Sequence, residues 1–458
     1  MHTNKLNIVI LAAGKGTRMN SQKPKVLHKL AGKPLLQHVI TSAQQLNPEK
    51  IVVVYGYGGE AVPEAFGQEE ITWVKQAEQL GTGHAVQQAM RHLDQDATTL
   101  ILLGDVPLVN ADSCKQLLQQ TQQLTLMTVK KTDPNGYGRI SRDGTGRVLA
   151  IVEHKDASAQ QREINEVNTG IIAVSNAYLA GWLQRLTNNN SQGEYYLTDI
   201  VAMAVQDGVT VATEITADES QVAGVNSKQD LAGLERIYQL RQATRLMQAG
   251  ATLHDPFRID VRGELEVGCD VEIDIGCIFE GKVTLAAGVK IGAYCVIKDT
   301  TIGAGTVIAP YSHMEQVKVA NDCRIGPYAR LRPGTELSMD THIGNFVEIK
   351  NSQVDVGSKI NHLSYVGDST VGKRVNIGAG TITCNYDGAH KYRTVIGDNA
   401  FIGSDTQLVA PVTIGEGATI AAGSTITKDA PDNQLTISRS RQTSIAGWKR
   451  PQKNSSKT

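Results

Sequence analysis

The sequence predicts an α/β protein in two parts: an open α/β domain over residues 1–227 and a parallel β-helix over residues 251–458, the latter including a polar tail. A helix over residues 228–250 is expected to join them. Two observations carry this prediction. Aliphatic residues recur every six positions between Val267 and Ile426, and apolar β-type runs alternate with glycine-rich loops from the amino terminus to Asn226. The first pattern is typical of a solenoid and the second of a buried parallel sheet.

The six-residue period indicates a coil with three flat faces, each of which turns one aliphatic side chain inward. A single turn cannot bury its own aliphatics, so successive turns must stack. Glycine often follows the aliphatic residue, and we expect it to supply corner conformations closed to other residues. Small residues stand four positions after the aliphatic, as a narrow triangular core requires. The repeat is carried by Val267, Ile273, Phe279, Leu285, Ile291, Ile297, Val319, Ile325, Leu331, Leu337, Ile343, Ile349, Ile396, Ile402, Leu408, Ile414, Ile420 and Ile426. The glycines are Gly292, Gly303, Gly326, Gly403 and Gly415. The small residues are Cys277, Cys295, Cys323, Ala329, Val347, Ala400, Thr406, Ala418 and Ser424.

Composition excludes several classes of function. The formal net charge of -1 gives no electrostatic reason to expect nucleic acid or an anionic membrane as a partner. The six cysteines form no CxxC pair and no metal-type cluster with histidine, and three of them occupy the small core position. The first apolar run, Ile8 to Ala13, is too short for a secretion signal, and no run approaches the roughly 20 apolar residues that cross a bilayer. We expect a soluble, cytoplasmic protein.

The amino-terminal loop has the features of a phosphate site. The apolar run Asn7 to Ala13 leads into Gly14-Lys15-Gly16-Thr17-Arg18-Met19, followed by Pro24-Lys25. A glycine turn after a strand lets backbone N–H groups approach phosphates, and the cations add countercharge. The loop is not a Walker A motif, and Met19 stands where a dinucleotide fingerprint has glycine. A short GxG turn by itself is also compatible with an ordinary loop.

Further polar turns follow the predicted strands. Asp105 comes directly after the buried strand Thr98 to Leu103, at the sheet edge where ligands of open α/β folds gather. Its carboxylate is well placed for Mg²⁺, although a turn-forming aspartate is the alternative. Glycine and amide turns that suit sugar hydroxyls occur at Gly136-Tyr137-Gly138-Arg139, Glu153-His154-Lys155, Asn168-Thr169-Gly170 and Gly224-Val225-Asn226.

The string LAAGKGTRM with Pro24-Lys25 resembles the signature of Rossmann-like sugar-phosphate nucleotidyltransferases, which join a nucleoside triphosphate to a sugar 1-phosphate and release pyrophosphate. The resemblance implies that Asp105 and Asn226 hold Mg²⁺. Many such proteins carry tyrosine where Leu103 stands, so any contact from that ring is lost here. The positions that it implies for UTP and UDP-N-acetylglucosamine are Leu11, Ala12, Ala13, Gly14, Arg18, Lys25, Gln76, Gly81, Thr82, Leu103, Gly104, Asp105, Gly138, Glu153, Asn168 and Asn226.

The six-residue repeat breaks at two places. His362 stands six residues after Val356, where the pattern calls for an aliphatic, and a histidine can accept a proton near neutral pH. A histidine satisfied at a coil corner is the alternative. Arg332 and Lys350 are separated by three six-residue steps, one full turn of the coil, so we expect them to stack on adjacent coils around an anion, or else to form a solvated charged edge. The second break, residues 384–394, predicts a loop that projects from the coil and covers a neighbouring subunit's groove.

The repeat resembles the left-handed β-helix of hexapeptide acyltransferases, which are usually trimers. Nearly the whole chain resembles the bifunctional bacterial family that makes UDP-N-acetylglucosamine for peptidoglycan and lipopolysaccharide precursors. The resemblance implies that His362 is the base of an acetyl transfer to glucosamine 1-phosphate and that a backbone N–H near Ala379 stabilises the oxyanion. It implies sugar-phosphate contacts at Arg332, Lys350, Tyr365 and Asn376, and acetyl-CoA contacts at Ala379, Asn385, Tyr386, Ser404, Ala422 and Arg439.

Two other interpretations compete with this one. The chain could be a single-function sugar-1-phosphate nucleotidyltransferase for another sugar, whose β-helix serves only assembly or regulation, or a binding scaffold similar to certain translation-factor exchange subunits. The constellation of His362, Arg332 and Lys350 argues against the first. The presence of Arg18, Lys25, Asp105 and His362 argues against the second.

Overall fold

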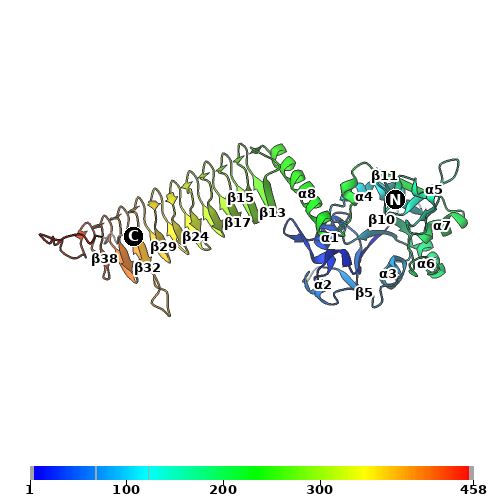
Figure 1. The fold of residues 1–458 in the computed structure, drawn as a ribbon, viewed down its shortest axis with the longest axis horizontal. Helices are drawn as coiled ribbons and strands as arrows, with labels where there is room; N and C mark the ends of the chain where they lie inside the picture. Colours follow the sequence, from blue (N-terminus) through cyan, green and yellow to red (C-terminus); the bar gives the residue numbers. More distant parts are fainter. Residues whose placement is uncertain (1–4, 68–69, 122, 453–458) are drawn as a thin grey trace, which may run out of the picture. The chain divides into compact units, whose positions relative to one another are not determined.

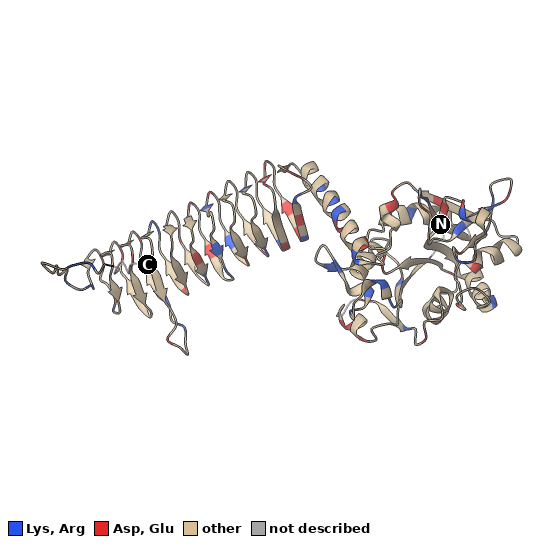
Figure 2. Ribbon diagram, viewed as in Figure 1, with Lys and Arg blue, Asp and Glu red and all other residues tan. Residues whose placement is uncertain are grey.

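The computed structural model describes residues 5–67, 70–121 and 123–452 (Figure 1). Its contacts divide the chain into two units, Met1–Gln242 and Ala243–Thr458. The polar tail predicted from Pro451 onward lies, from residue 453, outside the described residues. Among the described residues no helix is long and apolar enough to cross a membrane. Basic and acidic segments are interspersed along the ribbon of both units (Figure 2).

The first unit is built on a mixed nine-stranded sheet. Its strands in spatial order are β11 (Val211–Thr216), β7 (Leu124–Lys130), β10 (Glu166–Ser175), β6 (Thr98–Leu103), β1 (Leu6–Ala12), β4 (Lys50–Tyr55) and β5 (Thr72–Lys75), with β8 (Arg139–Arg142) and β9 (Val148–Val152) attached beside β10. The four strands from β6 to β5 are parallel, and β10 runs antiparallel to both neighbours. The expectation of a buried parallel strand holds for β1, whose Ile8, Val9 and Ile10 are all fully buried.

Helices cover both faces of this sheet. Ile8 and Ile10 of β1 pack with α1 (Leu35–Gln44) and α4 (Ala111–Gln120), whereas Val9 packs on the other face with α3 (Thr82–Ala89), α6 (Asn176–Arg185) and α7 (Asp199–Gln206). This split follows from the alternation of side chains along a strand. The shorter elements are α2 (Ala61–Glu64), α5 (Ala159–Arg162), the 3-10 turns η1 (Thr17–Met19), η2 (Lys25–Leu27), η3 (Met90–His92) and η4 (Glu219–Val222), and the ribbon of β2 (Lys29–Leu30) with β3 (Lys33–Pro34).

Helix α8 (Lys228–Gln248) contains the boundary between the two units. A capping box is present at its start: the Ser227 hydroxyl accepts a hydrogen bond from the Asp230 N–H at 3.1 Å, and the Asp230 carboxylate accepts from the N–H groups of Asn226 and Ser227. Gly250, with φ of +100°, follows the helix and supplies the left-handed stop.

The second unit is a parallel β-helix with two hydrogen-bonded sheets along its length. One face consists of β12 (Thr252–Leu253), β14 (Glu272–Ile273), β16 (Lys290–Ile291), β19 (Val307–Ile308), β22 (Arg324–Ile325), β25 (His342–Asn345), β28 (Lys359–His362), β31 (Asn376–Ile377), β34 (Phe401–Ile402), β37 (Thr419–Ile420) and β39 (Leu435–Thr436). The other two faces share β13 (Ile259–Val267), β15 (Cys277–Leu285), β17 (Val296–Lys298), β18 (Thr301–Ile302), β20 (His313–Glu315), β21 (Val317–Val319), β23 (Arg330–Leu331), β24 (Thr335–Leu337), β26 (Glu348–Lys350), β27 (Gln353–Val354), β29 (Tyr365–Gly367), β30 (Ser369–Val371), β32 (Ile382–Cys384), β33 (Thr394–Ile396), β35 (Gln407–Val409), β36 (Val412–Ile414) and β38 (Thr425–Ile426).

The register shows that successive coils differ slightly in length. Leu331 pairs with Ile349, 18 positions later, and Ile349 pairs with Val366, 17 positions later. The aliphatic side chains of the repeat form one continuous core, and all the small residues predicted to line it are buried. Burial raises the pKa of the Cys277 thiol to about 11 and that of Cys295 to about 12, so both cysteines are packing residues.

The predicted role of the repeat glycines is wrong for four of the five positions. Only Gly326 has a positive φ, +92°. The others are needed because the next coil passes close by: a Cβ on Gly292 would lie 2.7 Å from the Pro310 nitrogen, and one on Gly403 would lie 2.4 Å from the Ala422 nitrogen. The left-handed corners belong largely to other residue types, including the stacked rings of Tyr294, Tyr311, Tyr328 and Phe346.

The structure also corrects the expected register around His362. The inward residues there are Val354 and Ile360, because the step from Ile349 to Val354 is five positions instead of six. His362 therefore does not replace a core aliphatic. It lies two positions after Ile360, at the end of β28, and its side chain is exposed. An exposed imidazole can meet a substrate, which the core position would have prevented.

Candidate active sites

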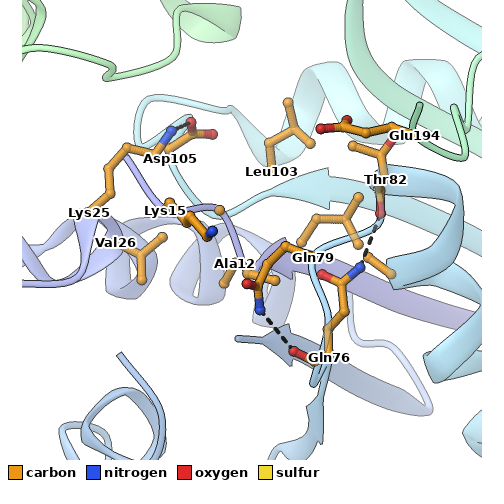
Figure 3. Close-up of a pocket in the computed structure, with 15 residues that line it drawn as sticks. Ala12, Lys15, Lys25, Val26, Gln76, Gln79, Thr82, Leu103, Asp105 and Glu194 are labelled. Atoms are coloured by element: carbon orange, nitrogen blue, oxygen red, sulfur yellow. Dashed lines mark hydrogen bonds and ion pairs between the residues drawn. The ribbon is translucent and has the colours of Figure 1, made fainter. Parts of the chain in front are cut away.

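Two adjoining hollows in the first unit collect the predicted nucleotide and sugar residues. A cavity of about 490 Å³ is lined by Leu11, Ala12, Ala13, Gly14, Lys25, Gln76, Gly81, Thr82, Leu103 and Asp105 (Figure 3). A second, of about 430 Å³, is lined by Arg18, Leu103, Asp105, Gly138, Glu153, Asn168 and Asn226. Gly104 lines neither, and its N–H donates to the Leu11 carbonyl at 2.9 Å. The parallel pairing of β1 with β6 brings the loops after both strands to the same sheet edge.

Lys25, Asp105 and Asn226 meet between these hollows. The Lys25 ammonium forms an ion pair with the Asp105 carboxylate, seen in Figure 3, and donates a hydrogen bond to the Asn226 side-chain oxygen at 3.3 Å. The side chains of Lys25 and Asp105 are only 12% and 19% exposed. One carboxylate and one amide oxygen thus already surround a single cation, which is the donor chemistry that Mg²⁺ prefers.

Gly16 allows this arrangement. It has a φ of +59°, and a Cβ placed on it would lie 2.7 Å from the Lys25 Cβ. The glycine loop therefore passes directly over the stem of Lys25. Any larger residue would be strained in the left-handed region and would push the lysine out of place.

Gln76 presents its carboxamide to the first cavity in a fixed orientation. It is 3% exposed, and its Nε2 donates to the Gly81 carbonyl at 3.1 Å and contacts His84 Nδ1 at 3.0 Å. A carbonyl can only accept, so the amide nitrogen must face Gly81, and the carboxamide oxygen remains for a ligand. His84, which sequence reasoning did not single out, holds this orientation.

The second hollow contains the carboxyl group of Glu153, whose charged form is disfavoured by burial. Burial raises the pKa of Glu153, and the Thr198 hydroxyl donates a hydrogen bond to it at 3.0 Å, which opposes that shift. Asn168 lies beside it at an irregularity of β10, where the pairing with β7 shifts register before Ile172. Such bulges redirect side chains at sites. Gly138 accepts a hydrogen bond from the Asn168 N–H at 2.8 Å, which brings these turns together.

In the second unit, the histidine predicted as a base has a defined tautomer. Asn345 and His362 pair on adjacent coils, and the Asn345 side-chain oxygen lies 2.9 Å from His362 Nδ1. Because that oxygen can only accept, Nδ1 carries the proton and Nε2 has a free lone pair. The exposed Nε2 can then take a proton from a bound substrate. Asn345 is a second residue that the sequence analysis missed.

Small residues form a column next to His362. Ile360, Ile377, Ile402 and Ile420 pair in succession along one face. The residues two positions after each are His362, Ala379, Ser404 and Ala422, so three of the predicted acetyl-CoA positions continue the line of the histidine. Arg439 closes the column, because its guanidinium donates to the Ala422 carbonyl at 2.7 Å. A column of small side chains leaves room for an extended ligand.

Cations gather on the neighbouring face. Arg332 and Lys350 each follow one of the paired residues Leu331 and Ile349, as their spacing predicts, and Arg332 also donates to Glu348 at 2.8 Å. The Lys391 ammonium lies against Lys350 and, with smaller contributions from desolvation and Arg332, lowers the pKa of Lys350. Such a cluster is stabilised by an anion. Lys391 was not predicted as a site residue.

The remaining predicted residues are placed as follows. Tyr365 lies on β29, with its hydroxyl over Gly367, which pairs with Lys350. Asn376 begins β31, the strand that follows β28 in the same sheet. Tyr386 is exposed on the inserted loop and forms a bridge with Lys391, whereas Asn385 at the base of the loop is buried. The loop projects from the coil in Figure 1 between β32 and β33.

Comparison with known proteins agrees with this geometry. Residues 8–162 match the model of the MobA-like NTP transferase domain, and residues 393–428 match that of the bacterial transferase hexapeptide (six repeats). The chain is 70% identical over 450 residues to the bifunctional protein GlmU of Methylobacillus flagellatus, covering 98% of both chains. It is 60% identical to that of Nitrosospira multiformis over 98% of both, and 58% identical to that of Aromatoleum aromaticum over 98% of this chain and 99% of the other. The chain belongs to the GlmU family.

Membership in the GlmU family confirms the predicted fold class, an α/β nucleotidyltransferase domain followed by a left-handed parallel β-helix of hexapeptide repeats. It also confirms the family resemblance drawn from LAAGKGTRM and from the repeat. His84, Asn345 and Lys391 escaped prediction because each acts beside a recognised residue without belonging to a motif. A basic residue inside the inserted loop was the one signal available for Lys391.

Proposed function

We propose that the chain is a bifunctional enzyme. It transfers the acetyl group of acetyl-CoA to glucosamine 1-phosphate and then transfers uridylyl from UTP to the product, giving UDP-N-acetylglucosamine and pyrophosphate for cell-envelope precursors. The observation that carries the proposal is the presence of two separate constellations, Lys25–Asp105–Asn226 in one unit and the His362 column in the other. The 98% coverage of relatives named bifunctional supports it.

In the acetyl transfer, the 2-amino nitrogen of the sugar attacks the thioester carbon while His362 Nε2 takes a proton from that amino group. A C–N bond forms, the C–S bond breaks, and the proton passes to the departing thiolate. Arg332, Lys350 and Lys391 bind the sugar phosphate, with Tyr365 and Asn376 around the sugar. The column Ala379, Ser404 and Ala422 receives the extended arm of acetyl-CoA, and a backbone N–H near Ala379 stabilises the oxyanion.

In the uridylyl transfer, a phosphate oxygen of N-acetylglucosamine 1-phosphate attacks the α-phosphorus of UTP in line with the departing pyrophosphate. Arg18 and Lys25 stabilise the charge on that leaving group. Gln76 receives the base, while Glu153 and Asn168 hold the sugar. Asp105 and Asn226 fit Mg²⁺, which neutralises phosphate charge when bound. No protein nucleophile is required.

The same proposal covers the partners and location. The ligands are small molecules, with no nucleic acid or membrane partner, and the enzyme is cytoplasmic. We expect a homotrimer through the β-helix. Exposed apolar side chains such as Phe401, Ile382 and Val307, together with the projecting loop, support association of the β-helix with other copies.

The test uses two variants and two separate assays on the full chain. His362→Ala should reduce release of free thiol from acetyl-CoA and glucosamine 1-phosphate by ~10²–10⁴-fold, and should leave release of pyrophosphate from UTP and supplied N-acetylglucosamine 1-phosphate unchanged. Asp105→Ala should do the reverse. His313→Ala, at an outward position of another coil, is the matched control. Undiminished thiol release by folded His362→Ala would reduce the β-helix to a scaffold.

A further inference from the structure

A buried carboxylate lies beneath the inserted loop of the β-helix. Asn351, Asp368 and Asn385 occupy one corner of three successive coils. Asp368 is 8% exposed and Asn385 is 7% exposed. One oxygen of Asp368 accepts a hydrogen bond from Asn351 Nδ2 and the other accepts from Asn385 Nδ2, both at 2.5 Å. Both carboxylate oxygens are therefore engaged by amide donors, and a buried charge so held fixes its partners in place.

Both ends of the inserted loop are attached to this residue. Asn385 begins the loop and bonds the Asp368 carboxylate through its side chain, whereas the Thr394 N–H at the far end donates to the Asp368 carbonyl at 3.3 Å. The Tyr392 N–H also donates to the Asn385 carbonyl at 2.9 Å. At this coil Val371 pairs directly with Ile396, so the intervening loop lies outside the ladder of strands that holds the other coils together.

The loop carries groups that face the cation cluster. Lys391 lies against Lys350, and Tyr386 is bridged to Lys391. Two ammonium groups in contact repel each other, so Lys391 would move away unless the loop were fixed at its base. The carboxylate of Asp368 supplies that fixation and also contributes negative charge near Lys350.

We propose that Asp368 is a positioning residue for acetyl transfer: its carboxylate anchors the loop through Asn385 and so places Lys391 and Tyr386 over the bound substrates. This inference rests on the proposed acetyltransferase function. It requires a carboxylate specifically, since asparagine at 368 has one acceptor oxygen and one NH₂ group. That NH₂ group would face the NH₂ of Asn351 or Asn385, so one contact breaks unless that carboxamide turns over, and in either case both hydrogen bonds lose the charge that strengthens them.

The experiment compares Asp368→Asn with Asp299→Asn in the full chain. Asp299 occupies an equivalent left-handed corner, with φ of 46° against 49° for Asp368, and accepts from the Lys282 N–H at 3.0 Å, away from the loop. We expect Asp368→Asn to lower kcat/KM for acetyl transfer about tenfold or more, as loss of a charge-assisted hydrogen bond predicts. Trypsin cleavage after Lys391 should accelerate, and uridylyl transfer should stay unchanged. Asp299→Asn should alter none of these.

A double variant separates positioning from general coil stability. In an Asn385→Ala background, adding Asp368→Asn should change acetyl transfer less than about twofold, because the link is already broken. Should Asp368→Asn fail to fold, Asn385→Asp serves instead, since two facing carboxylates should open the loop and expose Lys391 to trypsin. The inference would be overturned if Asp368→Asn and Asn385→Ala each kept the acetyl transfer and the trypsin cleavage of the wild type. It would also be overturned if Asp368→Asn lowered acetyl transfer as much in the Asn385→Ala background as in the wild type. Absence of thiol release by the wild type would refute the proposed function, while the cleavage assay would still decide whether Asp368 anchors the loop.

Discussion

Replacement of Lys25 by methionine is expected to tighten binding of a divalent cation to the nucleotide-free protein. In the structure the Lys25 ammonium lies between Asp105 and the side-chain oxygen of Asn226, the two groups proposed to hold the metal. A metal ion that enters before the nucleotide must displace this ammonium. Methionine keeps the length and apolar stem of lysine but removes the competing charge.

The size of the effect follows from the contacts that the metal must break. The Lys25–Asp105 pair is mostly buried, and a hydrogen bond between charged groups at such a position is worth roughly 1.5–3 kcal/mol. Since every 1.4 kcal/mol is a factor of ten, we expect the Kd of the binary complex to fall about tenfold at the lower end of that range. For UTP itself the effect should be the opposite: Lys25→Met should weaken binding of the nucleotide, because Lys25 pairs with phosphate once UTP is bound.

The assay titrates Mn²⁺ into wild-type and Lys25→Met protein without nucleotide and follows water proton relaxation, which does not depend on turnover. Lys15→Met, which changes a cation lining the same cavity, is the control and should leave the Kd unchanged. Equal or weaker Mn²⁺ binding by Lys25→Met would show that the ammonium does not compete for the metal position, and the reasoning would fail.

Three further predictions concern single side chains. Glu153→Gln should raise the melting temperature at pH 7, because burial raises the carboxyl pKa above its ordinary 4.5 and ionisation then opposes folding. Calorimetry should find that this gain in melting temperature grows as the pH rises through 4.5 and is absent well below it. A gain that did not depend on pH would contradict the proposed cause. His84→Ala frees the Gln76 carboxamide to rotate, so KM for UTP should rise about fivefold with weaker discrimination against CTP, and unchanged discrimination would argue against this role. Lys391→Met should raise KM for glucosamine 1-phosphate about tenfold with uridylyl transfer unaffected, measured as thiol and pyrophosphate release.

The repeat predicted more of the β-helix than of its corners. Inward aliphatics and small core residues such as Cys295 and Ala329 could be assigned from spacing, because the core accepts only those shapes. The corners could not, since Gly292 and Gly403 are required by the approach of the next coil, a contact between residues one full turn apart in the sequence.

At the site in the β-helix, too, the features that could not be predicted depend on how adjacent coils contact each other. A single five-position step changed the register at His362 and turned an expected core residue into an exposed one. Asn345 and Asp368 act through partners on adjacent coils, which no local motif records. In the first unit, LAAGKGTRM and the turn residues were local, and the structure places all but Gly104 of the predicted residues on two adjoining hollows.

One chain is proposed to carry out two successive reactions. The most direct test supplies purified protein with acetyl-CoA, glucosamine 1-phosphate, UTP and Mg²⁺, and follows free thiol and pyrophosphate separately. We expect pyrophosphate to lag behind thiol and not to form when acetyl-CoA is omitted. If acetyl-CoA and glucosamine 1-phosphate give no thiol, and pyrophosphate forms only when N-acetylglucosamine 1-phosphate is supplied in place of glucosamine 1-phosphate, the two-reaction proposal is contradicted.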